Sequence, residues 1–306
     1  EVLIFGNRWE VKGTIGKGAF SEIFAAEDMT GENGKELVAI KFHNAEFDSS
    51  VMKWEGIVLA DLSDIPYVPH LIYYGNEYER DYLVMELLSG EDMAQLRDRT
   101  RHNVDSKMIP IEIVSYLTRQ MMQCLEPMHK KGYVHRDVKP SNFVRRSAES
   151  TEFCIIDFGL AKQHRDAQGK LRPEREHVEF RGTTIYASPY VHSGHDQCPR
   201  DDMFSVLHVF LDLVLGDLPW RAQAKARDKA GVAALKAKLV KDPAAFLEDY
   251  IHWQEDIVQA DSQVPRSSHL FSLHCLCMHI HGSCAVAHLI NNVSLLSFAQ
   301  HVADLR

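Results

Sequence analysis

Three oxygen-bearing side chains occur in a fixed order within residues 134–159. Asp137 ends a His-Arg-Asp triplet, Asn142 lies five residues after it, and Asp157 opens an Asp-Phe-Gly triplet. Phosphoryl transfer needs a carboxylate that accepts the proton of the attacking hydroxyl, and oxygen ligands that hold Mg²⁺ against nucleotide phosphates. A loop followed by a short hairpin would bring these groups together. The order and separation of the two triplets therefore predict a phosphoryl-transfer site.

A turn suited to a phosphate lies near the start of the sequence. Residues 10–28 have the pattern strand, turn, strand, and the turn contains Gly16 and Gly18. Glycine has no Cβ, so the backbone of such a turn can approach a phosphate closely. Phe20 is placed to cap the bend, and Ser21 stands where a GxGxxG pattern has its third glycine. A plain tight hairpin explains the same residues equally well.

A lysine interrupts the apolar strand pattern of residues 37–42. Burying Lys41 costs free energy unless the ammonium is paired. The next element, residues 51–63, has a helical pattern, and Glu55 on it is the best candidate for the counter-ion. Gly56 weakens that helix. The alternatives are an edge lysine that reaches solvent and a solvated surface glutamate. The apolar stripe of the helix is Val51, Trp54, Val58 and Leu62.

Further along, the patterns predict one more strand and two long helices. Residues 81–88 form an apolar run that fits a buried strand leading into a linker. Residues 111–131 form an amphipathic helix that Gly132 ends, with Pro127 distorting its last turns. A second, strongly apolar helix runs to Gly216, and the acidic pair before it suits a helix N-terminus.

Composition describes an ordinary soluble globular protein: 306 residues, 45% hydrophobic and 25% charged. The net charge of −9 gives no support for nucleic-acid binding. The six cysteines lack the spacing of a disulfide framework, and the start EVLIFGNRWEV has no basic region and no cleavage site. We therefore expect free thiols and an intracellular, cytoplasmic location, with the nucleus allowed. The sequence contains no internal repeat.

Together these motifs resemble the protein kinase superfamily, and within it the casein kinase one group. The PSNF variant, the RP that follows the activation segment and the PWR ending look most like the tau-tubulin kinase branch. The resemblance covers roughly residues 7–230. It is carried by KPSNF (139–143), LAKQ followed by LRPER (160–175), FRGTTIYAS (180–188) and RDDMFSVLHVFLDLVLGDLPWR (200–221).

The resemblance implies an α+β, two-lobed protein kinase fold. It would have a small, mainly β lobe with the glycine-rich loop and hinge (1–88), a large, mainly α lobe (89–260) and a divergent C-terminal segment (261–306). The implied function is transfer of the γ-phosphate of ATP to serine or threonine hydroxyls of protein substrates. ATP and Mg²⁺ are the implied cofactors, and we expect a monomer that binds neither nucleic acid nor membrane. The rival function is a catalytically silent pseudokinase that acts as a binding scaffold.

The resemblance also assigns roles to single residues. Asp137 would accept the hydroxyl proton, and Lys139 would neutralise developing charge on the γ-phosphate. Asn142 and Asp157 would hold the metal. Met85 would be the gatekeeper beside the adenine pocket. The implied ATP-binding set is Ile15, Gly16, Gly18, Ile23, Ala39, Lys41, Glu55, Met85, Glu86 and Leu88, in which Glu86 and Leu88 offer backbone hydrogen bonds to the base.

Two further residues would support the catalytic loop. Thr183 would hydrogen-bond Asp137 and Lys139 in the substrate-docking loop, and Asp202 would accept hydrogen bonds from the catalytic-loop backbone. The sequence departs from the family pattern nearby. Ile185 stands where the group has an arginine that helps to bind an anion, which puts a preference for pre-phosphorylated substrates in doubt. The stretch 188–190 lacks the glutamate that most kinases pair with a late helix.

The activation segment lacks any residue that a kinase could phosphorylate. Residues 157–182 contain no serine, threonine or tyrosine. Many kinases use an arginine before the catalytic aspartate to bind a phosphate on this segment, and Arg136 is present here. We therefore expect activity that does not depend on phosphorylation of this segment. Acidic residues are the candidates to pair with Arg136 or its basic neighbours instead: Asp166, Glu174, Glu176 and Glu179.

The tail has an unusual composition. Between residues 262 and 306 only Arg266, Asp304 and Arg306 are charged, yet this stretch holds three of the six cysteines and six of the 17 histidines. Cys275 and Cys277 are closer than the CxxC spacing of common zinc sites, which disfavours a metal. Histidines interrupt the apolar run, which disfavours a membrane span. The segment is either a set of divergent late helices or the product of mis-splicing or a frame shift, and we favour the second. We expect the family resemblance to end near Asp261.

Overall fold

The computed structural model describes residues 3–18, 21–30, 36–44, 50–77, 79–103, 109–166, 168–176, 178–242 and 245–246. The chain divides into two compact units, and both are discontinuous in sequence. The first consists of Glu1–Gln95, Gln120–His135 and Pro140–Leu171. The second consists of Leu96–Arg119, Arg136–Lys139 and the chain from Arg172 onward. The domain boundaries predicted from the sequence stay a prediction, and the segment 261–306 lies outside the described residues.

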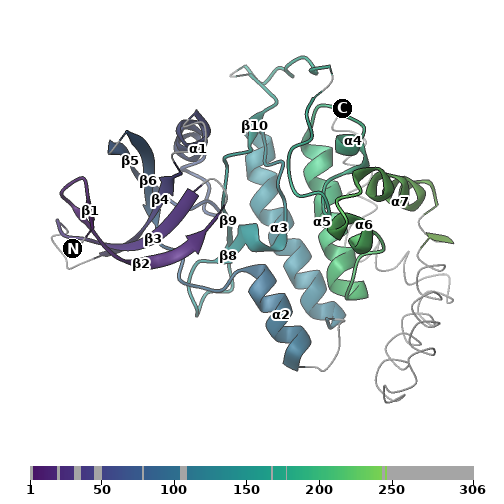
Figure 1. Cartoon of the computed structure of the whole chain (residues 1–306), viewed down its shortest axis with the longest axis horizontal. Coiled ribbons are helices and arrows are strands. Elements are labelled where there is room, and N and C mark those ends of the chain that lie inside the picture. The colour runs from purple at the N-terminus through teal and green to yellow at the C-terminus, as the bar shows by residue number, and fades with distance from the viewer. Residues whose placement is uncertain are drawn as a thin grey trace. The chain divides into compact units, whose positions relative to one another are not determined.

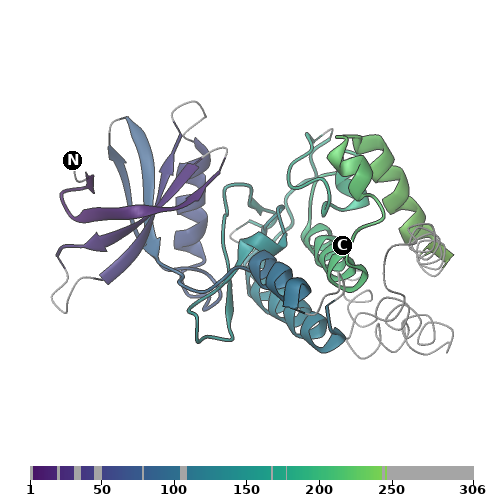
Figure 2. The ribbon, with the colours of Figure 1, turned by 60° about the horizontal axis from the view of Figure 1, so that its bottom comes forward.

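Six strands form one antiparallel sheet in the first unit (Figures 1 and 2). Helix α1 (Ser50–Asp61) packs against β5 and β6. The strand order is β1 (Ile4–Phe5), β2 (Trp9–Lys17), β3 (Ser21–Asp28), β4 (Glu36–His43), β6 (Arg80–Glu86) and β5 (Leu71–Glu77). The strands predicted within 10–28, 37–42 and 81–88 are therefore confirmed as β2, β3, β4 and β6, whereas β1 and β5 were not predicted.

Alternation along β4 divides the sheet into two faces. Val38, Ile40 and Phe42 belong to a buried cluster, while Ala39 and Lys41 point to the other face because successive side chains alternate. Fully burying one such apolar side chain contributes about 1.5–3 kcal/mol. The remaining buried members of the cluster are Phe5, Trp9, Ala26, Tyr82 and Val84. One face of the sheet thus holds the apolar core, which leaves the face of Lys41 for other uses.

Helix α1 confirms the helix predicted over residues 51–63, with a shifted inner face. Its buried residues include Met52 and Leu59, whereas Val51 is 36% exposed, so the prediction that Val51 belongs to the apolar stripe was wrong. Gly56 has a packing reason. A Cβ added there would lie 3.0 Å from Cδ2 of Leu83 on β6. Glycine therefore lets the helix approach the sheet closely, and this offsets its unfavourable helix propensity.

Short strands lie on both sides of the His-Arg-Asp triplet at residues 135–137. The hairpin predicted after it is confirmed as β8 (Phe143–Arg145) and β9 (Phe153–Ile155), which pair antiparallel. A single 3₁₀ turn, Pro140–Asn142, leads into β8. A second antiparallel pair joins β7 (Tyr133–Val134) and β10 (Lys162–Gln163).

The helices after the sheet have clear end signals. The helix predicted over 111–131 is confirmed as α3 (Ile111–Lys130); it runs through Pro127, and Gly132 follows it with φ +85°. The predicted apolar helix is confirmed as α5, where the side chain of Asp201 accepts from the backbone N–H of Cys198 at 2.9 Å and Gly216 ends the helix in the left-handed conformation. The other helices are α2 (Met93–Asn103), α4 (Pro189–His192), α6 (Arg221–Lys225) and α7 (Lys229–Lys241), and α5 spans Pro199–Leu215. Helix α7 contacts α4 and α6 (Figure 1).

A buried carboxylate organises the second unit. Asp212 on α5 is fully buried. Its carboxylate accepts from Arg97 at 3.0 Å, from Arg221 at 2.7 Å and from the Tyr186 hydroxyl at 2.9 Å. Because breaking one partner of a buried ion pair costs about 3–5 kcal/mol, Asp212 ties the helices of this unit to the segment that contains Tyr186.

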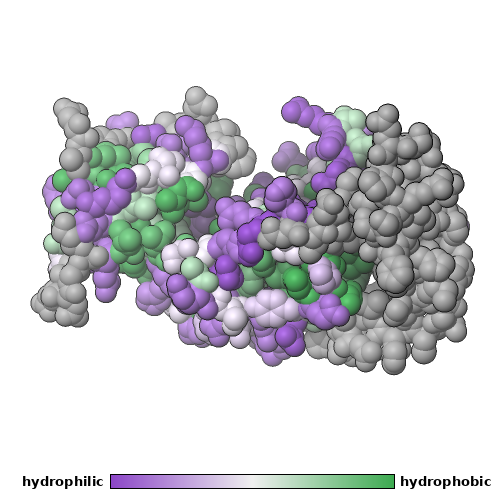
Figure 3. Space-filling view, turned by 90° about the horizontal axis from the view of Figure 1, so that it is seen from below, coloured by the Kyte–Doolittle hydropathy of each residue, from purple (hydrophilic) through white to green (hydrophobic). Residues whose placement is uncertain are grey.

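The described cysteines, helices and surface bear on the predictions made from composition. The three described cysteines, Cys124, Cys154 and Cys198, carry free thiols, as predicted. None of the described helices combines the length and the apolar character that a membrane span needs. On the face shown in Figure 3, apolar side chains lie among hydrophilic ones over the strands of the first unit. Exposed apolar residues of these strands include Ile4, Ile15 and Leu37. The zinc, membrane and splicing hypotheses for the tail concern residues outside the described ones.

Candidate active site

Predicted nucleotide-binding residues from four strands are brought together on one face of the sheet. The register places Gly16 opposite Ile23 and Ile23 opposite Lys41. It also places Ala39 opposite Met85. Opposed residues point to the same face, as do residues two apart on one strand. Ile23, Ala39, Lys41 and Met85 therefore share the face that the apolar core does not occupy.

The glycine-rich turn closes by a backbone hydrogen bond. The N–H of Gly18 donates to the carbonyl of Ser21 at 2.8 Å. Ile15, just before the turn, is 54% exposed, so its side chain is available to cover a ligand. Phe20, the predicted cap of the bend, lies outside the described residues.

Lys41 is the centre of a charged network in the first unit. Its Nζ lies 2.8 and 2.7 Å from Oε1 and Oε2 of Glu55, and 2.8 Å from Oδ1 of Asp157. Glu55 also accepts from the backbone N–H of Phe158 at 3.3 Å. The pairing of Lys41 with Glu55, predicted from the cost of burying a lysine in a strand, is confirmed. The network joins β4, α1 and the Asp-Phe-Gly triplet.

Two carboxylates keep the Lys41 ammonium charged although it is buried. Burial lowers the pKa of Lys41, but the charges and hydrogen bonds of Glu55 and Asp157 outweigh burial, so the pKa lies above its ordinary value. The Lys41 side chain is 10% exposed and that of Asp157 is 44% exposed. A fixed positive charge next to a carboxylate that solvent reaches suits the binding of an anion and a cation side by side.

The two predicted metal ligands lie on neighbouring stretches of backbone. The N–H of Ile156, the residue before Asp157, donates to the carbonyl of Asn142 at 2.9 Å. Asp157 has φ +70°, a left-handed conformation that costs a non-glycine residue roughly 1–2 kcal/mol. No cluster of three or more His, Cys, Asp or Glu side chains that could hold a metal alone occurs in the described parts of the chain. An amide and a carboxylate fit Mg²⁺, which commonly takes one or two carboxylates and completes its shell with phosphate oxygens and water.

His135 holds the residues on either side of Asp157. Its Nε2–H donates to the carbonyl of Ile156 at 3.0 Å, because a carbonyl only accepts. Its ring also packs edge-on against Phe158, with centroids 5.4 Å apart, and both side chains are fully buried. The strained Asp157 is therefore held by buried neighbours on either side, as persistence of such a conformation requires.

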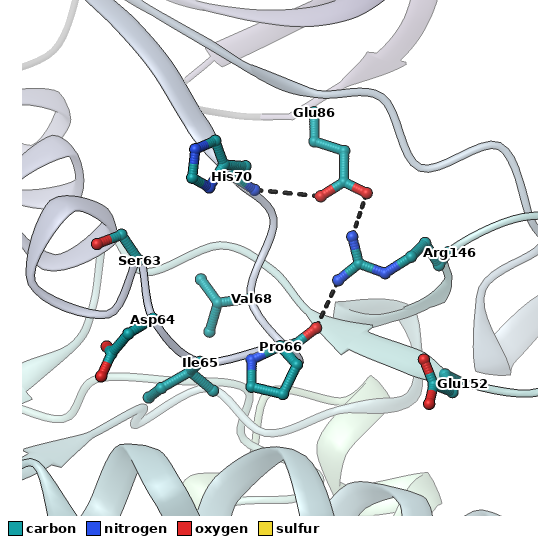
Figure 4. A pocket seen from close by; sticks show the side chains of 9 residues that line it. All are labelled: Ser63, Asp64, Ile65, Pro66, Val68, His70, Glu86, Arg146 and Glu152. Carbon is teal, nitrogen blue, oxygen red and sulfur yellow. Dashed lines mark hydrogen bonds and ion pairs between the residues drawn. The ribbon is translucent and has the colours of Figure 1, made fainter.

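The predicted hinge residues follow β6 or end it. The backbone N–H of Glu86 donates to the carbonyl of His70 at 2.9 Å, so a base hydrogen bond from Glu86 would have to use its carbonyl. Its carboxylate accepts from the N–H of His70 at 3.2 Å and forms an ion pair with Arg146 (Figure 4). Leu88 lies two residues beyond the end of β6 and is half-buried. The side chain of Glu86 is thus engaged away from any nucleotide.

A pocket of about 320 Å³ lies beside this ion pair. In Figure 4, Arg146 lies between the carboxylate of Glu86 and the carbonyl of Pro66. Of the predicted nucleotide-binding residues, only Glu86 lines it. The lining consists of Ser63, Asp64, Ile65, Pro66, Val68, His70, Glu86, Arg146 and Glu152. This pocket is therefore separate from the face that carries Lys41.

The predicted catalytic carboxylate lies in the second unit. Asp137 is 7% exposed. Its Oδ2 accepts from Nζ of Lys139 at 2.6 Å, and its Oδ1 accepts from Oγ1 of Thr183 at 2.6 Å. The predicted hydrogen bond between Thr183 and Asp137 is confirmed. Lys139 and Thr183, both predicted site residues, therefore orient the two oxygens of the Asp137 carboxylate.

The backbone around Asp137 is braced as predicted. Oδ1 of Asp202, in the first turn of α5, accepts from the N–H of Arg136 at 2.9 Å. Arg136 has φ +69°, a second strained non-glycine residue. Gly182 has φ +104°, and a Cβ there would collide with the carbonyl oxygen of Arg136. Only glycine therefore lets the segment that follows it lie this close to the catalytic loop.

Arg136 lies in a cluster of like charges. Burial lowers its pKa to about 10, and the charges of Arg181 and Arg175 act in the same direction against Asp196 and Asp202. Arg175 is fixed on Asp196, with Nη2 2.9 Å from Oδ1. None of the four acidic residues predicted to pair with Arg136 is among these groups, so that pairing stays a prediction.

Sequence reasoning missed a set of buried donors in the second unit. Lys236 on α7, Trp220 before α6 and His208 on α5 are each fully buried. Lys236 left a signal in the sequence. It lies four residues after Val232 and three before Leu239, at an apolar position of the helical period, and both of these neighbours are buried. A charged residue on an apolar stripe indicates a specific partner.

The chain is similar to known protein kinases over most of its length. A family model described as protein kinase domain matches residues 9–292. A "probable serine/threonine-protein kinase" of Dictyostelium discoideum is 40% identical over 253 residues, which are 80% of this chain and 49% of that protein. A "putative casein kinase I" of Caenorhabditis elegans is 31% identical over 283 residues, 89% of this chain and 81% of that protein. Casein kinase I homolog 3 of Schizosaccharomyces pombe is 31% identical over 230 residues, 74% of this chain and 50% of that protein.

The matches extend further along this chain than predicted, and they cover only part of two relatives. The family match runs to residue 292, so the prediction that the resemblance ends near Asp261 was wrong. The chain spans about half the length of the Dictyostelium and fission yeast relatives.

Proposed function

The chain belongs to the protein kinase family, and from that premise we propose that it transfers the γ-phosphate of ATP to serine and threonine hydroxyls of protein substrates. The observation that carries the proposal is the pair of contacts on Asp137, from Lys139 and Thr183, each at 2.6 Å. The resemblance associates both of these residues with serine/threonine specificity. The relatives named as serine/threonine and casein kinases support the same class.

In this mechanism Asp137 accepts the proton of the substrate hydroxyl. The two hydrogen bonds orient its carboxylate, and Lys139 places a positive charge where negative charge develops on the transferred group. Lys41, fixed by Glu55, binds the α- and β-phosphates of the nucleotide. Mg²⁺, when bound, neutralises charge on the phosphate oxygens. Asn142 and Asp157 are the side chains that would hold it.

We propose further that the enzyme is competent without phosphorylation of its activation segment. Residues 157–182 offer no hydroxyl, and the hydroxyl of Thr183 already donates to Asp137. The finer placement in the tau-tubulin kinase branch rests on the motif resemblance alone. Protein substrates and a monomeric state also belong to the proposal.

The competing function is a pseudokinase scaffold. Pseudokinases typically lose the lysine that binds phosphate or one of the two catalytic aspartates. Lys41, Asp137 and Asp157 are all present here, and each is held by specific partners. We therefore favour the active enzyme.

The test is a transfer assay with radiolabelled ATP and Mg²⁺ on casein and on myelin basic protein, followed by phosphoamino-acid analysis. We expect phosphoserine and phosphothreonine, and no label with the Asp137→Asn variant. Phosphotyrosine as the main product would contradict the substrate class. Nucleotide binding without any transfer would support the scaffold instead.

A further inference from the structure

Four consecutive backbone carbonyls after Thr183 are each held by a buried side chain. Residues 183–188 are called the docking segment here. Nζ of Lys236 donates to the carbonyls of Thr184, at 2.8 Å, and Ala187, at 2.6 Å. Between these two, the other carbonyls accept from Nε1 of Trp220 on Ile185 and from Nδ1 of His208 on Tyr186, both at 2.8 Å.

The donors come from three different elements. Lys236 is on α7, His208 is on α5 and Trp220 directly precedes α6 (Figure 1). All three side chains are fully buried, and the hydrogen bonds to Tyr186 and Ala187 are buried as well, so water does not compete for these two carbonyls. A buried carbonyl that loses its donor keeps the whole cost of desolvation. The backbone of the docking segment is therefore fixed by packing of the helices beneath it.

The environment of Lys236 is that of an uncharged amine. Burial lowers the pKa of Lys236 to about 6, and no described carboxylate forms an ion pair with it. His192 faces it from α4, with Nε2 3.3 Å from Nζ, and burial lowers the pKa of His192 to about 4. Burial also places the pKa of His208 well below its ordinary value. An unprotonated amine has two N–H donors, which match the two carbonyls of Thr184 and Ala187.

The held carbonyls lie directly beside the catalytic contact. The hydroxyl of Thr183 donates to Asp137. The carbonyl of Thr183 accepts from the N–H groups of Tyr186 and Ala187, each at 3.0 Å. The position of Thr183 is thus tied to the residues that Lys236, Trp220 and His208 hold. A shift of the segment would move Thr183 and alter the orientation of Asp137.

We propose that Lys236 is a positioning residue for protein phosphorylation, which holds the docking segment by its backbone so that a protein substrate meets a correctly oriented Asp137. Trp220 and His208 share this role. The inference rests on the proposed function and adds to it a determinant remote from the nucleotide residues. None of the three donors belongs to the motifs that define the catalytic and metal-binding set.

The first test compares Lys236→Met with Lys238→Met. Lys238 is exposed on the same helix, two residues further on, and is the matched control. With casein as substrate, we expect Lys236→Met to lower kcat/KM for casein by about tenfold to a hundredfold, since two buried hydrogen bonds are lost. KM for ATP should stay within about twofold of wild type. Equal kcat/KM for casein in both variants would overturn the proposal, and so would a KM for ATP raised well beyond twofold in Lys236→Met.

A second variant and a second measurement cover the case in which Lys236→Met does not fold. Trp220→Phe keeps an aromatic ring but removes the donor to the carbonyl of Ile185, and we expect a smaller loss of kcat/KM for casein. Amide hydrogen exchange of the peptide that contains Tyr186 and Ala187 should be faster in either variant than in wild type. Unchanged exchange in both would contradict the hold on the backbone.

The exchange measurement also separates the two proposals. If wild type transfers no phosphate to any protein, the proposed function fails, and so does the role of Lys236 in it. Faster exchange in Lys236→Met would then still show that the donors fix the segment. If wild type transfers phosphate and both variants match it, only the inference about Lys236 fails.

Discussion

Lys41 and Lys236 are both buried lysines, one in each unit, yet they are held by opposite means. Lys41 lies between the carboxylates of Glu55 and Asp157 at 2.7–2.8 Å. Lys236 lies among two backbone carbonyls and an imidazole. The pKa of the first lysine is raised above its ordinary value, and that of the second is lowered to about 6.

The difference separates two tasks. A charged lysine between carboxylates keeps a strong field that a phosphate can use, and it responds strongly when one partner is lost. An amine among carbonyls has no strong charge to offer a ligand, but its directional bonds fix a backbone. We infer that Lys41 uses its charge to bind, whereas Lys236 uses neutral hydrogen bonds to position a backbone. The following predictions test that division.

The largest effect is expected for Lys41→Met. Removing the ammonium should lower phosphate transfer by about a thousandfold or more, because the α- and β-phosphates of the nucleotide lose a preorganised positive charge. The measurement is the initial rate on casein at saturating ATP. Lys12→Met is the control, since Lys12 is a partly exposed lysine of the same sheet that pairs with Glu10. Turnover like wild type in purified Lys41→Met would refute the site.

A smaller effect is expected for Glu55→Gln, which removes one charge but keeps a hydrogen-bonding group. A hydrogen bond to a charged group contributes about 1.5–3 kcal/mol, so kcat/KM for ATP should fall by about tenfold to a hundredfold. KM for casein should change by less than about twofold. This is the mirror image of the result expected for Lys236→Met. A larger change in KM for casein than in kcat/KM for ATP would contradict the division of tasks between Lys41 and Lys236.

The two lysines should also differ in how stability depends on pH. Lys236 has a folded pKa near 6 and an unfolded one near 10.5, so between these values the unfolded chain binds more protons and stability rises with pH. The free energy of unfolding of wild type minus that of Lys236→Met should therefore increase with pH, by at most about 1.4 kcal/mol per unit.

Lys41 should contribute no such slope in the same range. Its folded pKa lies above the ordinary value, so its stabilisation is fully present below pH 10.5 and is lost only above that. Urea unfolding between pH 6.5 and 9 measures both differences. His192 and His208, which face Lys236, have lowered pKa values and stay neutral in the folded protein across this range. A flat difference for Lys236→Met would mean that Lys236 is charged in the folded protein.

The smallest effect is expected for phosphatase treatment. Residues 157–182 contain no hydroxyl that could carry a phosphate. The initial rate of bacterially expressed enzyme should change by less than about twofold after treatment. A large loss, traced by mass spectrometry to phosphate within residues 157–184, would contradict the expectation.

Much of the first network could be predicted from the sequence because it has a local cause. A lysine in an apolar strand requires a counter-ion, and the next helix offered Glu55. The contact of Thr183 with Asp137 and that of Asp202 with the N–H of Arg136 followed from motif resemblance, and both are present, whereas the contact of Thr183 with Lys139 stays a prediction. The family match confirms the predicted two-lobed protein kinase fold.

The hold on the docking segment could not be predicted in the same way. Its acceptors are backbone carbonyls, which every residue carries, so the segment itself gives no sign of being held. The one sign in this part of the sequence is that residues 188–190 lack the glutamate that most kinases pair with a late helix. The prediction for Val51 was wrong for a related reason. Helical period alone does not fix which edge of an apolar stripe meets the sheet, and Val51 lies on the exposed edge.

Holding a segment by its carbonyls leaves its side chains free to vary. The hydrogen bonds from Lys236 to Thr184 and from Trp220 to Ile185 end on C=O groups, so replacements of these two side chains keep both bonds as long as the backbone path is unchanged. Gly182 is different, because any Cβ there collides with Arg136. Residues 184 and 185 can therefore change without loosening the hold on the segment, whereas residue 182 cannot.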